Sequence, residues 1–231
     1  SDVCSSDLVG IFFWTWHSWT YDCPPMNVQE IIEQYPEAAN DYNHEIWAEY
    51  STTMHGYWNE PIYGYYRTYD RWVLRKQAEL LANSGVDVVF FDNTNGTLTW
   101  REGYLALCEV FSEALAQGVN VPKISFILPF GDSGCTYAQL KELYNEIFKT
   151  GLYRELWFYW EGKPLLMADP AALGSTLLGR EMQEFFTFRK PVPEYNAGSR
   201  LSSSRWGWLS VFPQSVYYRN DGTPEMTTVG V

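Results

Sequence analysis

The stretch of sequence from Gly64 to Gly96 constrains the fold more than any other part of the chain. The apolar residues of its first half recur at helical spacing, and they are Tyr69, Trp72, Val73, Leu80 and Leu81. Thr68 or Asp70 can cap the first turn of this helix, and Gly85 stands where a helix end favours positive φ. Val86 to Phe91 is then an almost continuous apolar run, typical of a parallel strand that is covered on both faces. The stretch therefore predicts a helix, a tight turn and a buried strand.

This predicted strand ends abruptly in the polar run Asp92-Asn93-Thr94-Asn95. In parallel α/β sheets, ligands and catalytic groups collect at the carboxyl ends of the strands. The run is therefore the first place at which we expect a functional site.

The rest of the chain repeats the alternation of strand and helix. Apolar runs predict further strands at 9–16, 121–130, 185–189, 207–212 and 226–231, and helical patterns cover 28–35, 101–116 and 137–149. Segments 156–159 and 163–168 flank Glu161-Gly162 and predict either a hairpin or a fourth strand. Asp169-Pro170 is a strong helix start, for a helix that runs to about Glu184. This order predicts an α/β fold, namely a (β/α)8 TIM barrel.

Both ends of the sequence indicate a fragment. Ser1 to Leu8 matches the translation of a sequencing-adapter end, so we expect residues 1–8 to be an artefact and 9–231 to be one partial barrel domain; a natural N-terminus is the alternative. Met226 to Val231 stops within a predicted strand. Since a full barrel takes about 250 residues, we expect about six or seven of its eight strands here.

The composition of the chain excludes several classes of partner. The formal net charge of −12 argues against nucleic acid and anionic membranes as partners, and no apolar run is long enough to span a membrane. Aromatic residues make up 18% of the chain, many of them in segments with loop character. Aromatic faces stack on the C–H faces of sugars, so a carbohydrate partner is expected. An aromatic-rich core is the alternative.

Cofactor and metal motifs are missing from the sequence. It contains no GxGxxG, GxxxxGK[ST], GxSxG, HExxH or CxxC pattern, so we expect no cofactor and no metal. Cys108 lies mid-helix and is expected in the core, whereas the sequence leaves open whether Cys23 and Cys135 pair. Acid–base chemistry then falls to carboxylates, two of which flank the scissile bond in glycoside hydrolysis.

Asp92 is the first catalytic candidate because of its position at a strand end. The alternative is a structural aspartate that accepts backbone N–H groups in the turn. Glu194, which follows the fifth predicted strand, is the second candidate, with a loop residue as its alternative. The candidate sugar-binding residues are Trp16, His17, Trp58, Glu60, Asn93, Asn95, Trp206 and Gln214. Core packing is the rival explanation for one of Trp206 and Trp208.

Four segments carry a resemblance to a known group of enzymes: VGIFFWTWH, GYYRTYD, AELLANSGVDVVFFDNTNG and WFYWEGKPLLM. Over Val9 to Ala168 the chain resembles glycoside hydrolase families 99 and 71 and the related WbsX-like proteins. The resemblance implies a (β/α)8 barrel that acts on glycans without a cofactor. The paired catalytic glutamates of family 99 come from an NEWxEGT-like segment, which is missing here, so their roles are assigned to no residue of this chain.

These observations together predict a secreted or periplasmic glycoside hydrolase with an aromatic-lined groove. A non-catalytic glycan-binding barrel and a WbsX-like protein associated with glycan biosynthesis are the alternatives.

Overall fold

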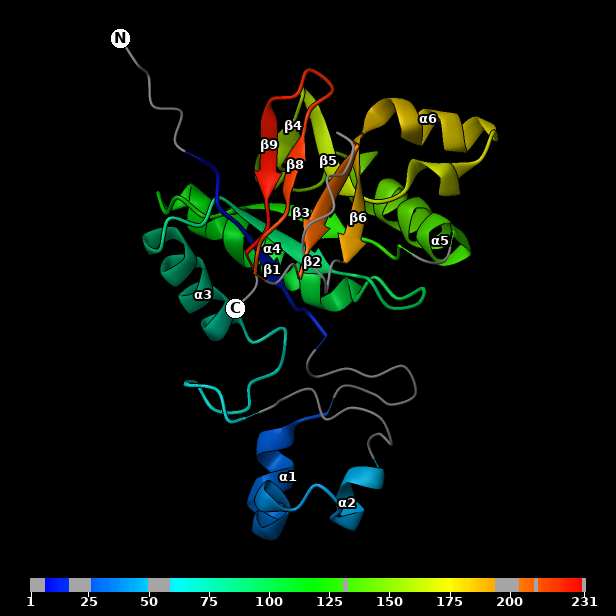
Figure 1. The fold of residues 1–231 in the computed structure, drawn as a ribbon. Helices are drawn as coiled ribbons and strands as arrows, with labels where there is room; N and C mark the ends of the chain where they lie inside the picture. The colour runs from blue at the N-terminus through cyan, green and yellow to red at the C-terminus, as the bar shows by residue number, and fades with distance from the viewer. Residues whose placement is uncertain are drawn as a thin grey trace. The chain divides into compact units, whose positions relative to one another are not determined.

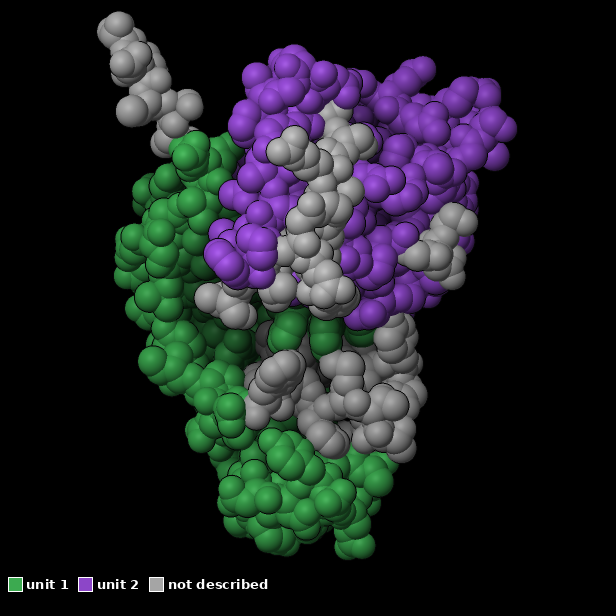
Figure 2. Space-filling model, in the orientation of Figure 1, with its two compact units in different colours: residues 1–87, 100–122 green, residues 88–99, 123–231 purple. Residues whose placement is uncertain are grey.

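A computed structural model describes residues 7–16, 26–49, 59–130, 133–193, 204–209 and 212–229. The chain divides into two compact units, shown in different colours in Figure 2. Unit 1 comprises Ser1–Asp87 and Trp100–Pro122, and unit 2 comprises Val88–Thr99 and Lys123–Val231.

The described residues of unit 1 form one strand and the helices of the first half of the chain (Figure 1). Its elements are β1 (Gly10–Phe13), α1 (Val28–Gln34), the 3-10 helix η1 (Pro36–Asn40), α2 (Glu45–Ala48), α3 (Arg71–Asn83) and α4 (Arg101–Ala116). The short helices bury a local core that includes Ile31 and Trp47, whose indole N–H donates to the carbonyls of Ala38 and Asp41.

The helix predicted from the opening stretch is confirmed as α3. The Asp70 side chain caps it by accepting from the backbone N–H of Val73, and Gly85 follows its end with φ of 75°. The apolar residues that predicted this helix do not all face inward, because Trp72 is 58% exposed and Leu80 50% exposed. The helix turns Val73, Leu74 and Ala78 inward instead, and Arg71 forms ion pairs with Glu109 and Glu113 of α4.

Unit 2 is built on a parallel sheet. Its strands β2 (Val88–Asp92), β3 (Lys123–Ile127), β5 (Lys163–Met167), β6 (Thr187–Pro193) and β7 (Arg205–Trp208) are hydrogen-bonded neighbours in that order. The prediction of an α/β fold with a parallel sheet is therefore confirmed.

This sheet is curled. In a flat sheet, strands about 4.8 Å apart would place β2 and β7 roughly 19 Å from each other. The ring centroids of Phe90 on β2 and Trp206 on β7 are nevertheless only 6.5 Å apart. Phe130, which follows β3, meets Trp208 at the end of β7 with centroids 5.7 Å apart. The curl therefore brings β2 and the end of β3 toward β7 across the inner face of the sheet.

Helices cover the other face of the sheet. Phe91 and Phe126 meet there at 5.0 Å, and Phe126 also contacts Phe148 in the π-helical turn η2 (Tyr144–Phe148). That turn extends α5 (Ser133–Leu143), and Phe148 packs in turn on Phe186, just after α6 (Leu177–Phe185). Alternate residues of β2 thus point to opposite faces, as the two-residue period of a strand requires.

The segment between η2 and β5 is a hairpin, as the sequence allows. After the 3-10 helix η3 (Arg154–Leu156), β4 (Tyr159–Trp160) pairs antiparallel with β5. The connecting residues Glu161 and Gly162 both have positive φ, at 52° and 81°. Two such residues define a type I′ turn, whose twist matches that of the flanking strands.

Several boundaries differ from the prediction; for example, the strand predicted at 185–189 is β6, which begins only at Thr187, because Phe185 ends α6. The helix predicted from Asp169 to about Glu184 is broken: the 3-10 helix η4 (Pro170–Leu173) ends at Gly174, whose φ is 59°, and α6 starts only after its own cap, Thr176. The strand predicted at 207–212 is β7, and that at 226–231 is β9 (Pro224–Thr227). β9 pairs antiparallel with β8 (Val216–Tyr218), which the sequence reasoning missed.

Candidate functional site

The carboxylate of Asp92 lies at the carboxyl end of β2. The residue is 3% exposed, and its Oδ1 accepts from the backbone N–H of Thr94 at 3.1 Å and from the Thr94 hydroxyl at 2.8 Å. This is the turn geometry that we gave as the structural alternative for Asp92. A carboxylate held by fixed donors in a buried place is also suited to chemistry, so the turn does not decide its role.

Asp92 faces the inner side of the curled sheet. In a strand, residues two apart share a face, so Asp92 shares the face of Phe90. Phe90 contacts Trp206 across that face. The buried carboxylate therefore belongs to the inner face of the sheet, at its carboxyl edge, where βα barrels carry their active sites.

Gln139 of α5 fixes the loop that follows Asp92. The side chain is fully buried, and its Nε2 donates to the carbonyl oxygens of Asn93 at 2.9 Å, Gly96 at 2.8 Å and Leu98 at 3.2 Å. A second tether joins the same two segments, because the hydroxyl of Thr99 donates to Oε1 of Glu142 at 2.5 Å. The polar run is thus anchored to a helix.

Two aromatic side chains lie at the same carboxyl edge. Phe130 comes three residues after β3 and is 38% exposed, while Trp208 is the last residue of β7 and is half-buried. Their contact leaves ring surface open to solvent next to the ends of the strands. Such surface is suited to stacking on a sugar ring.

Asp169 lies two residues beyond the carboxyl end of β5 and adds a second carboxylate after a strand end. Its side chain caps η4 through the N–H of Ala171 and forms an ion pair with Lys190 of β6. Burial alone would raise the pKa of Asp169, but the hydrogen bonds from Lys190 and Ala171 outweigh it and lower the pKa below its ordinary value. Asp169 is therefore a helix cap, as expected.

The remaining predicted residues of unit 2 fall in different surroundings. Asn93 continues the β2–β3 ladder and is fully buried, and neither atom of its side-chain amide has a hydrogen-bond partner among the described residues. Asn95 is exposed in the loop, Gln214 is half-buried before β8, and Trp206 is buried. Core packing therefore accounts for Trp206, and Trp208 is the more accessible of the two tryptophans.

In unit 1, Trp16 belongs to a row of aromatic rings that follows β1. Trp14 and Trp16 lie 5.3 Å apart, and Trp16 lies 6.0 Å from Trp100, which precedes α4. Trp14 is exposed and Trp16 half-buried, so this row also offers ring surface to solvent.

Glu60 is exposed. The predicted residues His17, Trp58 and Glu194 lie outside the described residues, as does Cys23, so the pairing of Cys23 with Cys135 stays open. Cys108 is buried as expected.

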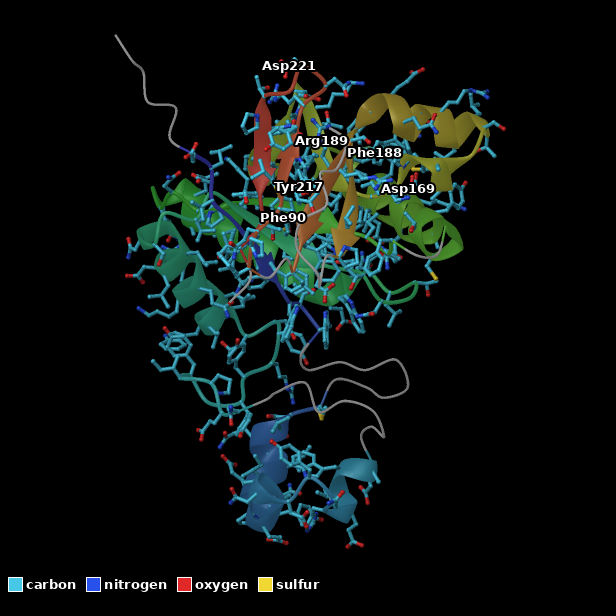
Figure 3. All side chains as sticks on the ribbon, in the orientation of Figure 1. Phe90, Asp169, Phe188, Arg189, Tyr217 and Asp221 are labelled. Atoms are coloured by element: carbon cyan, nitrogen blue, oxygen red, sulfur yellow. The ribbon has the colours of Figure 1, made fainter. Side chains whose placement is uncertain are left out.

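A buried charge cluster joins β4, β6, β7 and β9, with Arg189 of β6 opposite Met167, the last residue of β5. The carboxylate of Glu225 on β9 accepts from Nε and Nη2 of Arg189, at 3.0 and 2.7 Å, and from the indole N–H groups of Trp160 and Trp206, both at 3.0 Å. Arg189 also pairs with Glu161 through the same Nη2. Figure 3 shows Arg189 close to the β8–β9 hairpin.

This cluster is structural rather than catalytic. Burial alone would raise the pKa of Glu225, but the hydrogen bonds from Arg189, Trp206 and Trp160 lower it below its ordinary value. The side chain has no exposed surface, and its two oxygens are taken up by these donors.

Sequence reasoning missed Gln139, Phe130 and the Glu225 cluster. Gln139 sits in a helix more than 40 residues from the loop that it holds, and no local pattern signals such a bond. Phe130 was predicted as the end of a strand, and only the shorter β3 turns it into an edge residue. Glu225 becomes visible only once β8 pairs with β9.

Among the described residues, no group of His, Cys, Asp and Glu side chains could hold a metal ion, and no described helix is long and apolar enough to cross a membrane. Comparison of the chain with protein-family models, with curated proteins and with solved structures finds no match.

Proposed function

We propose that the chain is part of a glycoside hydrolase whose site lies at the carboxyl edge of the curled sheet of unit 2. The observation that carries the proposal is the buried carboxylate of Asp92, which shares the inner face with Phe90 and ends β2. The aromatic pair Phe130 and Trp208 at the same edge supports a sugar as the ligand. We also propose that the sheet is the larger part of a (β/α)8 barrel related to families 99 and 71.

In this proposal, Asp92 acts as the acid/base or as an electrostatic partner of the sugar ring. Its fixed bonds to Thr94 hold one carboxylate oxygen in place while the chemistry proceeds. Hydrolysis needs a second carboxylate, about 5–5.5 Å away for retention of configuration or about 6.5–9.5 Å for inversion. Glu194, which directly follows the last residue of β6, is the residue that we propose for it.

A non-catalytic glycan-binding protein is the second candidate. It is favoured by the turn geometry of Asp92, because an aspartate engaged by Thr94 can be structural while the aromatic surfaces still bind sugar. A WbsX-like role in glycan biosynthesis is the third. Glycan binding without cleavage would distinguish these two alternatives from a glycoside hydrolase.

The test is a panel of poly- and oligosaccharides, with binding followed by tryptophan fluorescence and cleavage by release of reducing ends. We expect both signals for one class of glycan. Trp208→Ala should weaken binding, whereas Trp72→Ala, which removes an exposed tryptophan from α3 of unit 1, is the control and should leave binding intact. Binding without cleavage favours the glycan-binding protein, and a panel without any binding contradicts both.

A further inference from the structure

We propose that Gln139 is a positioning residue for the reaction at Asp92. The inference rests on the proposed function and extends it to a side chain that touches no substrate. Gln139 is fully buried in α5, and its amide nitrogen donates to the carbonyl oxygens of Asn93, Gly96 and Leu98.

These three carbonyls span the loop that begins at Asp92. Thr94 holds the Asp92 carboxylate through its N–H and hydroxyl. The amide group of Gln139 therefore fixes the backbone around Thr94 and after it. The backbone N–H of Asn93 donates to the carbonyl of Ile127, which fixes the near side through the sheet. The carboxylate is thus held between a strand ladder and a helix.

Loss of the Gln139 donors leaves three loop carbonyls without this partner. The loop then gains freedom at Thr94, and the carboxylate moves with it. Because a displacement of about 1 Å at a reacting group can cost on the order of 10²-fold in rate, kcat is the quantity that responds. Binding of the sugar depends on the aromatic surfaces, so KM should change far less.

The experiment uses two variants of nearly the same size. Gln139→Met removes the donors at every pH. Gln139→Glu removes them while the new carboxylate is ionised and restores one O–H donor when it is protonated, and burial raises the pKa of such a group. Gln183→Met is the matched control, because Gln183 is exposed on α6 and donates to one carbonyl, that of Pro170, at 3.4 Å.

Kinetics on the glycan that the wild type cleaves, together with hydrogen exchange at the amides of Asn93 and Thr94, decide the proposal. We expect a kcat lowered on the order of 10²-fold in Gln139→Met, with faster exchange at Thr94. In Gln139→Glu, kcat relative to wild type and protection of Thr94 should both recover as the pH falls. A space-filling role of Gln139 predicts no such recovery.

The positioning role of Gln139 and the proposed hydrolase function can fail independently of each other. Wild-type kcat in both variants despite faster exchange at Thr94 overturns the role of Gln139 and leaves the proposed function standing. A wild type that cleaves no glycan overturns the proposed function. In that case hydrogen exchange alone decides whether Gln139 positions the loop. An unchanged exchange rate at the Thr94 amide in Gln139→Met overturns the positioning role of Gln139. If Gln139→Met does not fold, Gln139→Glu with its new carboxylate ionised replaces it as the variant without donors, and the same variant at acidic pH is the comparison.

Discussion

At the scale of single residues, Glu225 shows how unit 2 accommodates a fully buried charge. Removing a carboxylate from water is costly unless donors replace its hydration, and here Arg189, Trp160 and Trp206 supply them. Arg189 and Arg219 also lie over the rings of Trp206 and Trp160, at 5.7 and 5.6 Å from the ring centroids. The cluster therefore ties β9 to β4, β6 and β7 through one side chain.

We expect Glu225→Gln to lower the free energy of unfolding by up to about 3–5 kcal/mol, because it leaves the Arg189 guanidinium buried with its partner neutralised. Urea denaturation measures the change. Glu184→Gln, on the exposed surface of α6, is the control and should change little. Equal stability of the two variants would show that the cluster contributes nothing.

The same residue gives an expectation for pH. The folded pKa of Glu225 lies below the ordinary value of 4.5. The stabilisation is therefore complete above pH 4.5 and is lost as the pH falls through the folded pKa. Glu225→Gln should lack the part of acid unfolding that comes from protonation of Glu225. An acid unfolding curve identical to that of the wild type would contradict this contribution of Glu225.

Tyr144 supplies the opposite dependence at alkaline pH. Burial, together with the hydrogen bond from its hydroxyl to Glu181, raises its pKa from 10.0 to about 12. The protonated hydroxyl of Tyr144 therefore stabilises the fold, fully so below pH 10. That stabilisation is lost as the pH rises through about 12. We expect Tyr144→Phe to abolish that part of the alkaline transition, whereas Tyr159→Phe, at an exposed position, retains it. Alkaline unfolding followed by circular dichroism gives the measurement.

At the scale of elements, the β8–β9 hairpin rests on β7 at a glycine. A Cβ on Gly207 would lie 2.1 Å from the hydroxyl oxygen of Tyr217 and 2.5 Å from its ring, and Tyr217 is fully buried. We expect Gly207→Ala to destabilise unit 2 by about 1–3 kcal/mol through overpacking. Tyr217→Leu should relieve part of that cost, so a double-mutant cycle measured by denaturation should be non-additive. Strict additivity would mean that the two residues do not meet.

The elements that could be predicted from the sequence are those with local signals. The cap at Asp70, the glycine after α3 and the apolar run of β2 each follow from neighbouring residues, and all three are confirmed. Two predictions failed for different reasons, one because of a distant partner and one because of a local glycine. β8 is only three residues long and becomes a strand because β9 pairs with it, and Gly174 interrupts a helix whose start signal at Asp169 was sound.

At the scale of the whole molecule, the curl of the unit 2 sheet is the feature on which the site depends. Phe90 and Trp206 belong to strands at opposite ends of the unit 2 strand order, so their coupling reports the curl directly. We expect a double-mutant cycle of Phe90→Leu and Trp206→Leu to give a coupling of about 0.5–1.5 kcal/mol. The pair Phe90→Leu and Trp157→Leu gives a control cycle. A coupling energy between Phe90 and Trp206 no larger than that of the control would contradict their contact across the curled sheet.

The site could be predicted only in outline. The rule that carboxyl ends of strands collect functional groups led to Asp92, and the structure places it buried at that edge. The same rule cannot say which residues of other strands meet there, because that depends on the curl and on where each strand stops. Phe130 and Trp208 come together for this reason, and Gln139 reaches the loop from a helix.

The central claim is that Asp92 does chemistry, and a matched pair of variants tests it most directly. Asp221, at the tip of the β8–β9 hairpin, accepts from the N–H and hydroxyl of Thr223, which is the arrangement that Asp92 has with Thr94 (Figure 3). The measurement is kcat of Asp92→Asn and Asp221→Asn on the glycan cleaved by the wild type. We expect a loss of about 10²-fold or more for Asp92→Asn alone, with folding and binding retained. Equal kcat in the two variants would show that Asp92, like Asp221, only holds a turn.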